Sequence, residues 1–150
     1  MGSFIRLQGG AQPRLTLFVD TSIWSLAFRR DAPAPVAQVD KLTSALEGGD
    51  PVLATGIVLQ ELLQGFAGPK AQQKIIDRFK AIPLVVPDRG DHIAAAELRN
   101  RCRWAGVQVG TVDVLLAQLC IRHGLRMLTT DNDFRHMTPH CKLKIWSPPA

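Results

Sequence analysis

Residues 15–22 read Leu-Thr-Leu-Phe-Val-Asp-Thr-Ser, and this stretch carries the two signals that decide the fold. Its first five residues are almost all apolar, which is typical of a short strand buried on both faces of a parallel sheet. Asp20, Thr21 and Ser22 then supply side chains that can cap the start of a helix. The stretch therefore predicts a buried strand that leads directly into a helix, as in α/β folds.

The same alternation of strands and helices continues to the end of the chain. Further strands are expected at 51–54, 84–86, 126–129 and 143–146, and helices at 23–28, 36–46, 55–64, 69–81, 91–105 and 111–123. Helices separate the strands and no two-residue hairpin turn occurs, so we expect a three-layer α/β/α sandwich with a central, mostly parallel sheet of about five strands. Residues 1–14 are expected to form a flexible leader, and residues 15–150 a single domain.

The composition limits the classes of protein to consider. The chain has 150 residues and carries 18 Lys and Arg against 13 Asp and Glu, a net charge of +5, which favours a polyanionic partner. The three cysteines are widely spaced and form no Cys-x-x-Cys pair, so a disulfide framework or a zinc site is not expected. No run approaches the ~20 apolar residues of a membrane span, and no signal peptide is recognisable. We expect a cytoplasmic protein.

Five carboxylates stand in otherwise apolar surroundings. They are Asp20 at the end of the first strand, Glu61, Asp113, and the pair Asp131 and Asp133 after the strand at 126–129. Ligands of open parallel sheets collect beyond the carboxyl ends of the strands where the strand order reverses, and we expect those two strands to be neighbours. Acids gathered there repel one another and call for a divalent metal, and oxygen-only ligands favour Mg²⁺ or Mn²⁺. This pattern predicts a metal-dependent phosphodiesterase.

Each acid also has a purely structural interpretation. Asp20 can cap a helix, and Asp113 can complement a helix dipole. Asp131 and Asp133 can form a turn, and Glu61 lies on a narrow polar helix face that would normally point to solvent. Taken one at a time, the acids leave both interpretations open.

Four motifs follow one another along the chain: Phe-Val-Asp20-Thr-Ser-Ile-Trp, Leu-Gln-Glu61-Leu-Leu-Gln-Gly, Gly-Thr-Val-Asp113-Val-Leu-Leu-Ala and Leu-Thr-Thr-Asp131-Asn-Asp133-Phe. In this order they resemble the PIN domain family. The resemblance spans about residues 15–146 and is in particular to the VapC toxins of prokaryotic toxin–antitoxin pairs. It implies a PIN-like fold and an Mg²⁺- or Mn²⁺-dependent endoribonuclease, the toxin of a type II pair, which forms a homodimer and is inhibited by a cognate VapB-type antitoxin.

The resemblance also implies roles for individual residues. The catalytic acids of the family fall on Asp20, Glu61, Asp113 and Asp131, with Asp133 as an additional metal ligand. Ser22 and Thr130 match hydroxyl positions beside these acids. Carboxylates that hold a metal suit phosphodiester hydrolysis, in which no Lys or His has to act as nucleophile.

Further side chains are candidates for contacts with RNA or with a partner. The basic candidates for the RNA backbone are Arg29, Arg30, Arg99, Arg101, Arg103 and Arg135. Trp24 and Phe28 are expected either to pack against protein or to stack on a base. The break at Pro33 and Pro35 separates two apolar helices, a surface expected to form the groove for an antitoxin segment.

Other function classes remain open at the level of sequence. A haloacid-dehalogenase-like phosphatase needs a second acid at the position of Ser22, and a receiver-type signalling domain needs an acid pair after the first strand. Neither explains Glu61 and Asp113. A PIN-domain nuclease of RNA processing outside a toxin–antitoxin pair, or a catalytically silent binding module, would keep the same fold.

Overall fold

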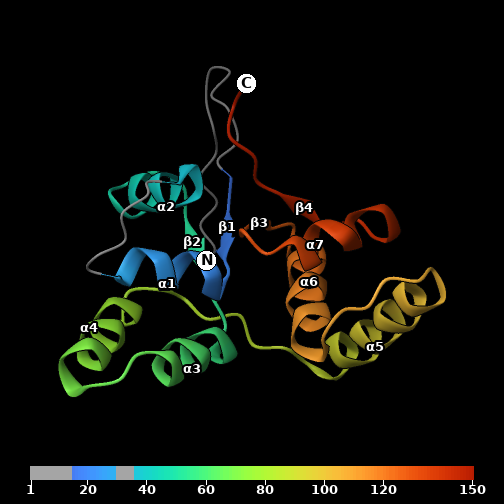
Figure 1. Cartoon of the computed structure of the whole chain (residues 1–150), viewed down its shortest axis with the longest axis horizontal. Helices are drawn as coiled ribbons and strands as arrows, with labels where there is room; N and C mark the ends of the chain where they lie inside the picture. Colours follow the sequence, from blue (N-terminus) through green and yellow to red (C-terminus); the bar gives the residue numbers. More distant parts are fainter. Residues whose placement is uncertain (1–14, 30–35) are drawn as a thin grey trace, which may run out of the picture.

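A parallel sheet forms the centre of the computed structural model, which describes residues 15–29 and 36–150. Its strands are β1 (Leu17–Val19), β2 (Val52–Leu53), β3 (Arg126–Leu128) and β4 (Lys144–Ile145), in the order β2-β1-β3-β4 (Figure 1). The register pairs Leu17 with both Val52 and Arg126. The chain thus moves from β1 to β2 and later returns to the other side of β1. This confirms that β1 and the strand before Asp131 are neighbours, so the strand order reverses between them.

The sheet has four regular strands, where the sequence predicted about five. The segment expected as a strand at 84–86 forms only an isolated parallel bridge between Leu84 and Ala54. Two backbone hydrogen bonds hold it, from Ala54 N to the Pro83 carbonyl at 3.1 Å and from Val85 N to the Ala54 carbonyl at 2.7 Å. Pro83 and Pro87 on either side have no N–H to donate, so the ladder stops after one bridge.

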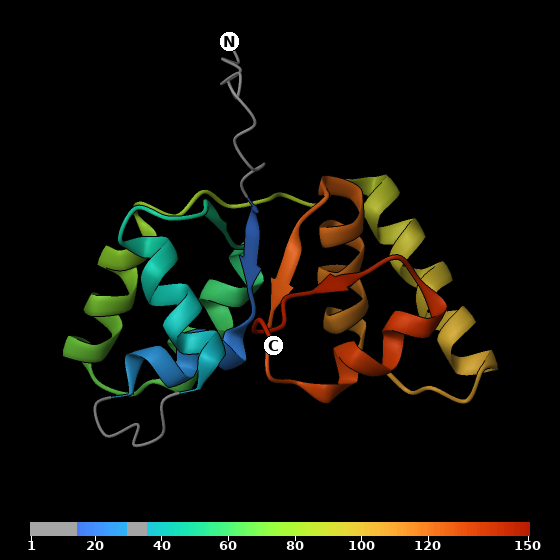
Figure 2. The same ribbon diagram turned by 90° about the horizontal axis from the view of Figure 1, so that it is seen from above.

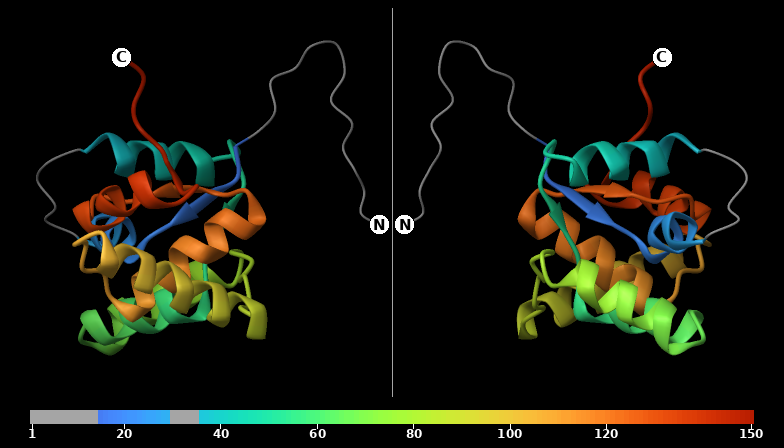
Figure 3. Two further views of the ribbon diagram at one scale, coloured as in Figure 1. Left: turned by 90° about the vertical axis from the view of Figure 1, so that its right-hand side faces the viewer. Right: turned by 90° about the vertical axis from the view of Figure 1, so that its left-hand side faces the viewer.

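Helices cover both faces of the sheet. They are α1 (Thr21–Phe28), α2 (Ala37–Leu46), α3 (Gly56–Gly65), α4 (Pro69–Phe79), α5 (Arg89–Trp104), α6 (Thr111–His123) and α7 (Asn132–Met137), with a 3₁₀ turn at Thr138–His140. Figure 2 shows α1 to α4 on the β2 side of the strands and α5 to α7 on the other side. In Figure 3, α2 lies on one side of β1, and α3, α4, α5 and α6 lie on the opposite side. This is the predicted three-layer α/β arrangement.

Side-chain caps determine where several helices begin. Asp20 accepts a hydrogen bond from Ser22 N at 3.4 Å, as the sequence predicted, and Thr55 accepts one from Val58 N at 3.3 Å. Helix α5 starts earlier than expected, because Asp88 and Asp91 form a reciprocal capping box around its first turn. Helix α7 was not predicted, since its six residues are too few for a helical pattern to emerge.

The hydrophobic core surrounds β1, whose three residues are completely buried. Trp24 on α1 packs in the same core, with its ring 4.7 Å from that of Phe79 and 5.9 Å from that of Phe28. Trp24 is 1% exposed, so it packs against protein and is not available for base stacking. Within the described residues, none of the helices is both long and apolar enough to cross a membrane. The expected leader at 1–14 and the Pro-rich break at 31–35 lie outside the described residues.

Candidate active site

The loops after β1 and β3 meet at the point where the strand order reverses (Figure 2). Asp20 follows β1 directly, and its backbone N–H continues the ladder by donating to the Leu128 carbonyl at 3.0 Å. Asp131 stands three residues beyond Leu128 and caps α7. Two of the predicted acids are therefore brought to one edge of the sheet by the strand pairing alone.

Asp20 is the most deeply buried of the five acids, with 6% of its surface exposed. Its Oδ2 accepts hydrogen bonds from the Ser22 hydroxyl and the Thr129 hydroxyl, both at 2.9 Å. Burial raises the pKa of Asp20, and the hydrogen bonds from Ser22 and Thr129 oppose that rise because they favour the ionised form. Asp20 caps α1, so the structural interpretation holds, but a cap alone does not require this burial.

A small network of hydroxyl groups connects the two strand ends. Thr130 donates its backbone N–H to the Ser22 hydroxyl at 3.2 Å, and Asp131 donates its N–H to the Thr129 hydroxyl at 2.9 Å. The hydroxyl that reaches Asp20 from this strand is thus that of Thr129, whereas Thr130 is exposed and contributes its backbone. Thr129 was not among the sequence candidates. The available signal was its place at the end of a buried strand, where a hydroxyl has to find a partner.

Glu61 reaches the same region from α3. Its Oε1 accepts a hydrogen bond from the Thr21 hydroxyl at 2.7 Å, which ties α3 to the first residue of α1. Its polar neighbours Gln60 and Gln64 bond to each other at 2.9 Å and face solvent. Glu61 is half-buried, and so it stands at the inner edge of the polar helix face.

Asp113, in the first turn of α6, completes the group. One carboxylate oxygen from each of Asp113, Asp131 and Asp133 can be chosen so that all three lie within 4.8 Å of one another. Asp133 is held by its backbone N–H, which donates to Asp131 Oδ1 at 2.9 Å. Such a set of oxygen ligands suits a hard divalent cation.

The pKa of Asp113 shows that the acids act on one another. It is raised from 3.8 to about 6, first by burial and then by the negative charges of Asp131, Asp20, Asp133 and Glu61. None of the five acids forms an ion pair with Lys, Arg or His anywhere in 15–29 and 36–150. The fold thus concentrates negative charge at this edge without supplying its own cation.

Among the described residues, one group of three or more metal-ligating side chains has its ligand atoms close together, and it consists of Asp113, Asp131 and Asp133. His136, His140 and Cys141 are not part of such a group in this part of the chain. The three cysteines are free thiols.

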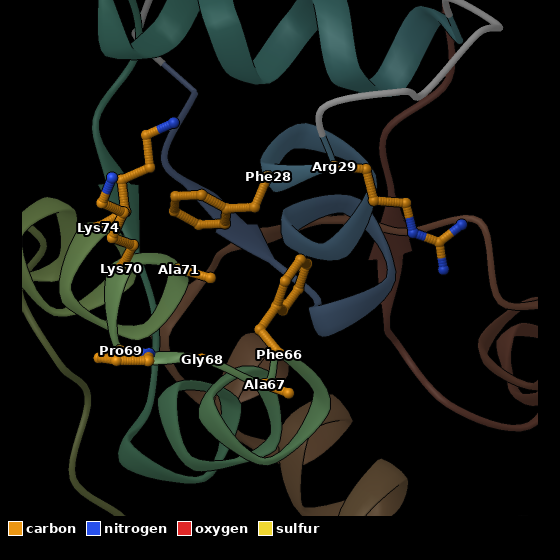
Figure 4. A pocket seen from close by; sticks show the side chains of 9 residues that line it. All are labelled: Phe28, Arg29, Phe66, Ala67, Gly68, Pro69, Lys70, Ala71 and Lys74. Atoms are coloured by element: carbon orange, nitrogen blue, oxygen red, sulfur yellow. The ribbon is translucent and has the colours of Figure 1, made fainter.

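A pocket whose lining contains none of the five acids lies between the end of α1 and the start of α4 (Figure 4). It has a volume of about 820 Å³. Phe28 and Phe66 line it with their ring centroids 6.3 Å apart, and Lys70 and Lys74 stand on the side opposite Arg29. The pocket is therefore apolar within and basic at its rim.

The predicted arginines occupy separate surfaces. Arg29 borders the pocket of Figure 4, Arg135 is exposed on α7, and Arg30 lies outside the described residues. Arg99, Arg101 and Arg103 lie on the second half of α5, where Arg101 and Arg103 are exposed and Arg99 is half-buried.

Comparison with known proteins adds to this geometry. Residues 17–138 match the family model described as PIN domain. VapC ribonuclease Mb1587 of Mycobacterium bovis and ribonuclease VapC11 of Mycobacterium tuberculosis are each 31% identical over 120 residues, which cover 79% of this chain and 88% of the relative. The solved structure of VapBC2 from Rickettsia felis, bound to a DNA fragment from its promoter, matches with a TM-score of 0.70 at 18% identity and covers 89% of this chain and 100% of that chain. At that identity the structural match concerns the fold.

Proposed function

This chain belongs to the PIN domain family, and from that premise we propose that it is a VapC-type endoribonuclease, the toxin of a type II toxin–antitoxin pair. The observation that carries the proposal is the group of five acids, which has no cation of its own among the described residues. Burial and then the negative charges of the other four acids raise the pKa of Asp113 to about 6. A fold gains nothing in stability from such a group. It is expected where a metal ion and a phosphodiester have to be bound.

We propose that the ion is Mg²⁺ or Mn²⁺ and that the five acids hold it. Asp113, Asp131 and Asp133 present oxygens that are close enough to share one ion. The charges of Asp20 and Glu61 add to the negative potential at this place. When bound, such an ion lowers the pKa of a coordinated water and stabilises charge on the phosphoryl group.

The remaining residues of the site orient these carboxylates. Ser22 and Thr129 hold Asp20 through hydrogen bonds from their hydroxyls to its Oδ2. Thr21 fixes one oxygen of Glu61 in the same way. The hydroxyls of Ser22 and Thr129 favour the ionised form of Asp20, which is the form that binds a cation.

The experiment that tests the proposal is RNA cleavage by the purified chain after chelation and metal return. We expect no cleavage in chelator and recovery with Mg²⁺ or Mn²⁺, with new RNA ends inside the strand. Cleavage that persists in chelator would rule out the metal-dependent mechanism, and absence of cleavage with every metal and RNA would rule out the nuclease.

We further propose a VapB-type antitoxin as the protein partner and a homodimer as the assembly. The pocket in Figure 4 supports the first part, because its two phenylalanines can receive apolar anchors and its lysines can pair with acids flanking them. Co-expression with the small protein encoded next to this chain should relieve toxicity and yield a copurifying complex. Phe66→Asp should abolish copurification, whereas Gln73→Asp on the exposed side of α4 should not.

A further inference from the structure

We propose that the end of helix α5 holds the substrate strand: Arg99 and Arg103, one turn apart on one face, bind RNA phosphates, and Trp104 at the last position of the helix stacks on an adjacent base. The inference rests on the proposed endoribonuclease function and says where that substrate lies.

Arg99 is anchored in a way that leaves its charge available. Its Nε donates to the Val109 carbonyl at 3.0 Å, so the plane of the guanidinium is fixed while the terminal NH₂ groups point elsewhere. No carboxylate among residues 15–29 and 36–150 forms an ion pair with it. A fixed, unpaired guanidinium is well suited to a phosphate, which it can meet with two parallel hydrogen bonds.

Two hollows meet at this arginine. One, of about 350 Å³, lies between α5 and α6 and is lined by Arg99 together with Asn100 and Thr111. The other, of about 140 Å³, lies between α5 and the following loop and is lined by Arg99 and Arg103. Arg103 follows Arg99 by one helical turn, so both side chains stand on the same face.

The same face is connected to the acids by a short path. The loop 105–110 joins α5 to α6, and its Val109 carbonyl is the group that Arg99 holds. The next residue, Gly110, lies against the Asp113 carboxylate: a Cβ placed on it would be 3.6 Å from Asp113 Oδ2. A strand bound at Arg99 therefore passes beside the acidic group. A polyanion approaching that group needs cations along its way, because the acids alone repel it.

Trp104 supplies a second kind of contact. It is the last residue of α5, one position after Arg103, and 81% of its surface is exposed. A broad aromatic surface next to arginines is the combination that holds single-stranded nucleic acid, since every base offers a face to stack on. A two-fold interface between copies of the chain, centred here, would instead bring the same unpaired arginines together.

The helix also carries a matched control. Arg101 is exposed and unpaired among the described residues, like Arg103, but it is two positions away and so points to another side of the helix. It lines neither of the hollows that contain Arg99. Charge alone predicts equal effects for Arg101 and Arg103, whereas the proposed face predicts different ones.

The test measures binding of a fluorescent poly(U) oligonucleotide to the full chain carrying Asp20→Asn, so that binding is read without cleavage. We expect Arg103→Ala to weaken binding about tenfold and to lower the salt dependence by about one phosphate contact. Arg101→Ala should change affinity less than about twofold. Trp104→Ala should weaken binding about tenfold with unchanged salt dependence, and Trp104→Phe should retain most of the affinity.

Equal effects of Arg101→Ala and Arg103→Ala would overturn the proposal. So would a Trp104→Ala variant that keeps its RNA affinity but changes molar mass in light scattering, because the face would then be an interface between copies. If the unmodified chain cleaves RNA while none of these variants alters binding, the inference fails and the nuclease assignment survives. If the expected binding pattern appears but the unmodified chain cleaves nothing, the RNA-binding face stands and the nuclease assignment fails.

Discussion

The molecule contains two groups of acids, and among the described residues only one of them is paired with an arginine. At the start of α5, Asp88 and Asp91 share Arg122, whose Nη1 lies 2.6 Å and 2.8 Å from their carboxylate oxygens. The pKa of Asp88 is lowered, first by the N–H of Asp91 and then by Arg122. At the ends of β1 and β3 no such arginine is present among the described residues, and the pKa of Asp113 is raised.

We propose that this difference separates structural acids from functional ones. A fold that needs a buried carboxylate provides a cation for it, as the chain does for Asp91 with an arginine 31 residues away. For the five acids that have no cation among the described residues, we propose that the positive charge is supplied by a bound metal ion. The contrast between the two acid groups can be tested with variants, with metal ions and with pH.

The first prediction compares two Asp→Asn variants. Asp20→Asn should lower RNA cleavage by about 10³-fold or more, because it removes a metal-binding charge while keeping the volume of the side chain. Asp88→Asn should leave cleavage unchanged, since asparagine also caps helices well. Cleavage rates on one RNA, with circular dichroism to verify folding, decide between them. If the Asp20→Asn variant cleaves RNA at an undiminished rate, Asp20 acts only as a helix cap.

The second prediction removes the cation from the structural group. Arg122→Met should lower the free energy of unfolding by about 2–3 kcal/mol, because Asp91 remains behind as a buried and unpaired carboxylate. The control Arg101→Met removes an arginine that forms no ion pair in the described residues and should cost less than about 0.5 kcal/mol. Urea unfolding measures both. Equal losses would mean that the pair with Asp91 contributes little.

The sequence predicts the features of this contrast that depend on neighbouring residues, and it does not predict those that depend on residues far apart in the chain. Four of the five acid positions follow from local signals, because Asp20, Asp113, Asp131 and Asp133 each stand at a strand end or in a first helical turn, whereas Glu61 lies in the middle of α3. The pairing of β1 with β3 confirms the expected neighbourhood of Asp20 and Asp131. Arg122 could not be assigned to Asp91, since no local pattern connects the end of α6 with the start of α5.

The sequence also could not predict details that depend on a shift of one residue or on the orientation of one side chain. Thr129 and Thr130 are adjacent and both carry a hydroxyl, and which of them faces Asp20 depends on where the β3 ladder ends. The segment 84–86, expected as a strand, forms only an isolated bridge, because the flanking prolines limit the hydrogen bonds of so short a segment. Glu61 was the weakest candidate by helical periodicity, and only the contact with Thr21 shows that it turns inward.

The third prediction supplies the missing cation. Saturating Mg²⁺ or Mn²⁺ should stabilise the chelator-treated chain by about 1–3 kcal/mol, because the ion binds the folded acid group and relieves its repulsion. The rise in thermal midpoint should be lost in Asp113→Asn and kept in Asp88→Asn. A thermal midpoint that does not change with millimolar Mn²⁺ would contradict a metal site at these acids.

The last prediction uses pH to distinguish the two groups. The pKa of Asp113 is about 6 in the folded chain and 3.8 ordinarily, so between these values the folded state binds more protons than the unfolded state. Its contribution to stability is therefore fully present below pH 3.8 and is lost as the pH rises through 6.

In chelator, wild type should accordingly lose about 1 kcal/mol relative to Asp113→Asn between pH 4 and pH 7, after allowance for solvent screening of a half-buried group. Asp88 has a lowered pKa, so its contribution has the opposite sign: it is present above the ordinary value and lost as the pH falls. Wild type should thus gain stability relative to Asp88→Asn as the pH rises from acid. Urea unfolding of the three proteins across this range measures both slopes. Slopes of the same sign would mean that the two acid groups do not differ in the way their hydrogen bonds and charges require.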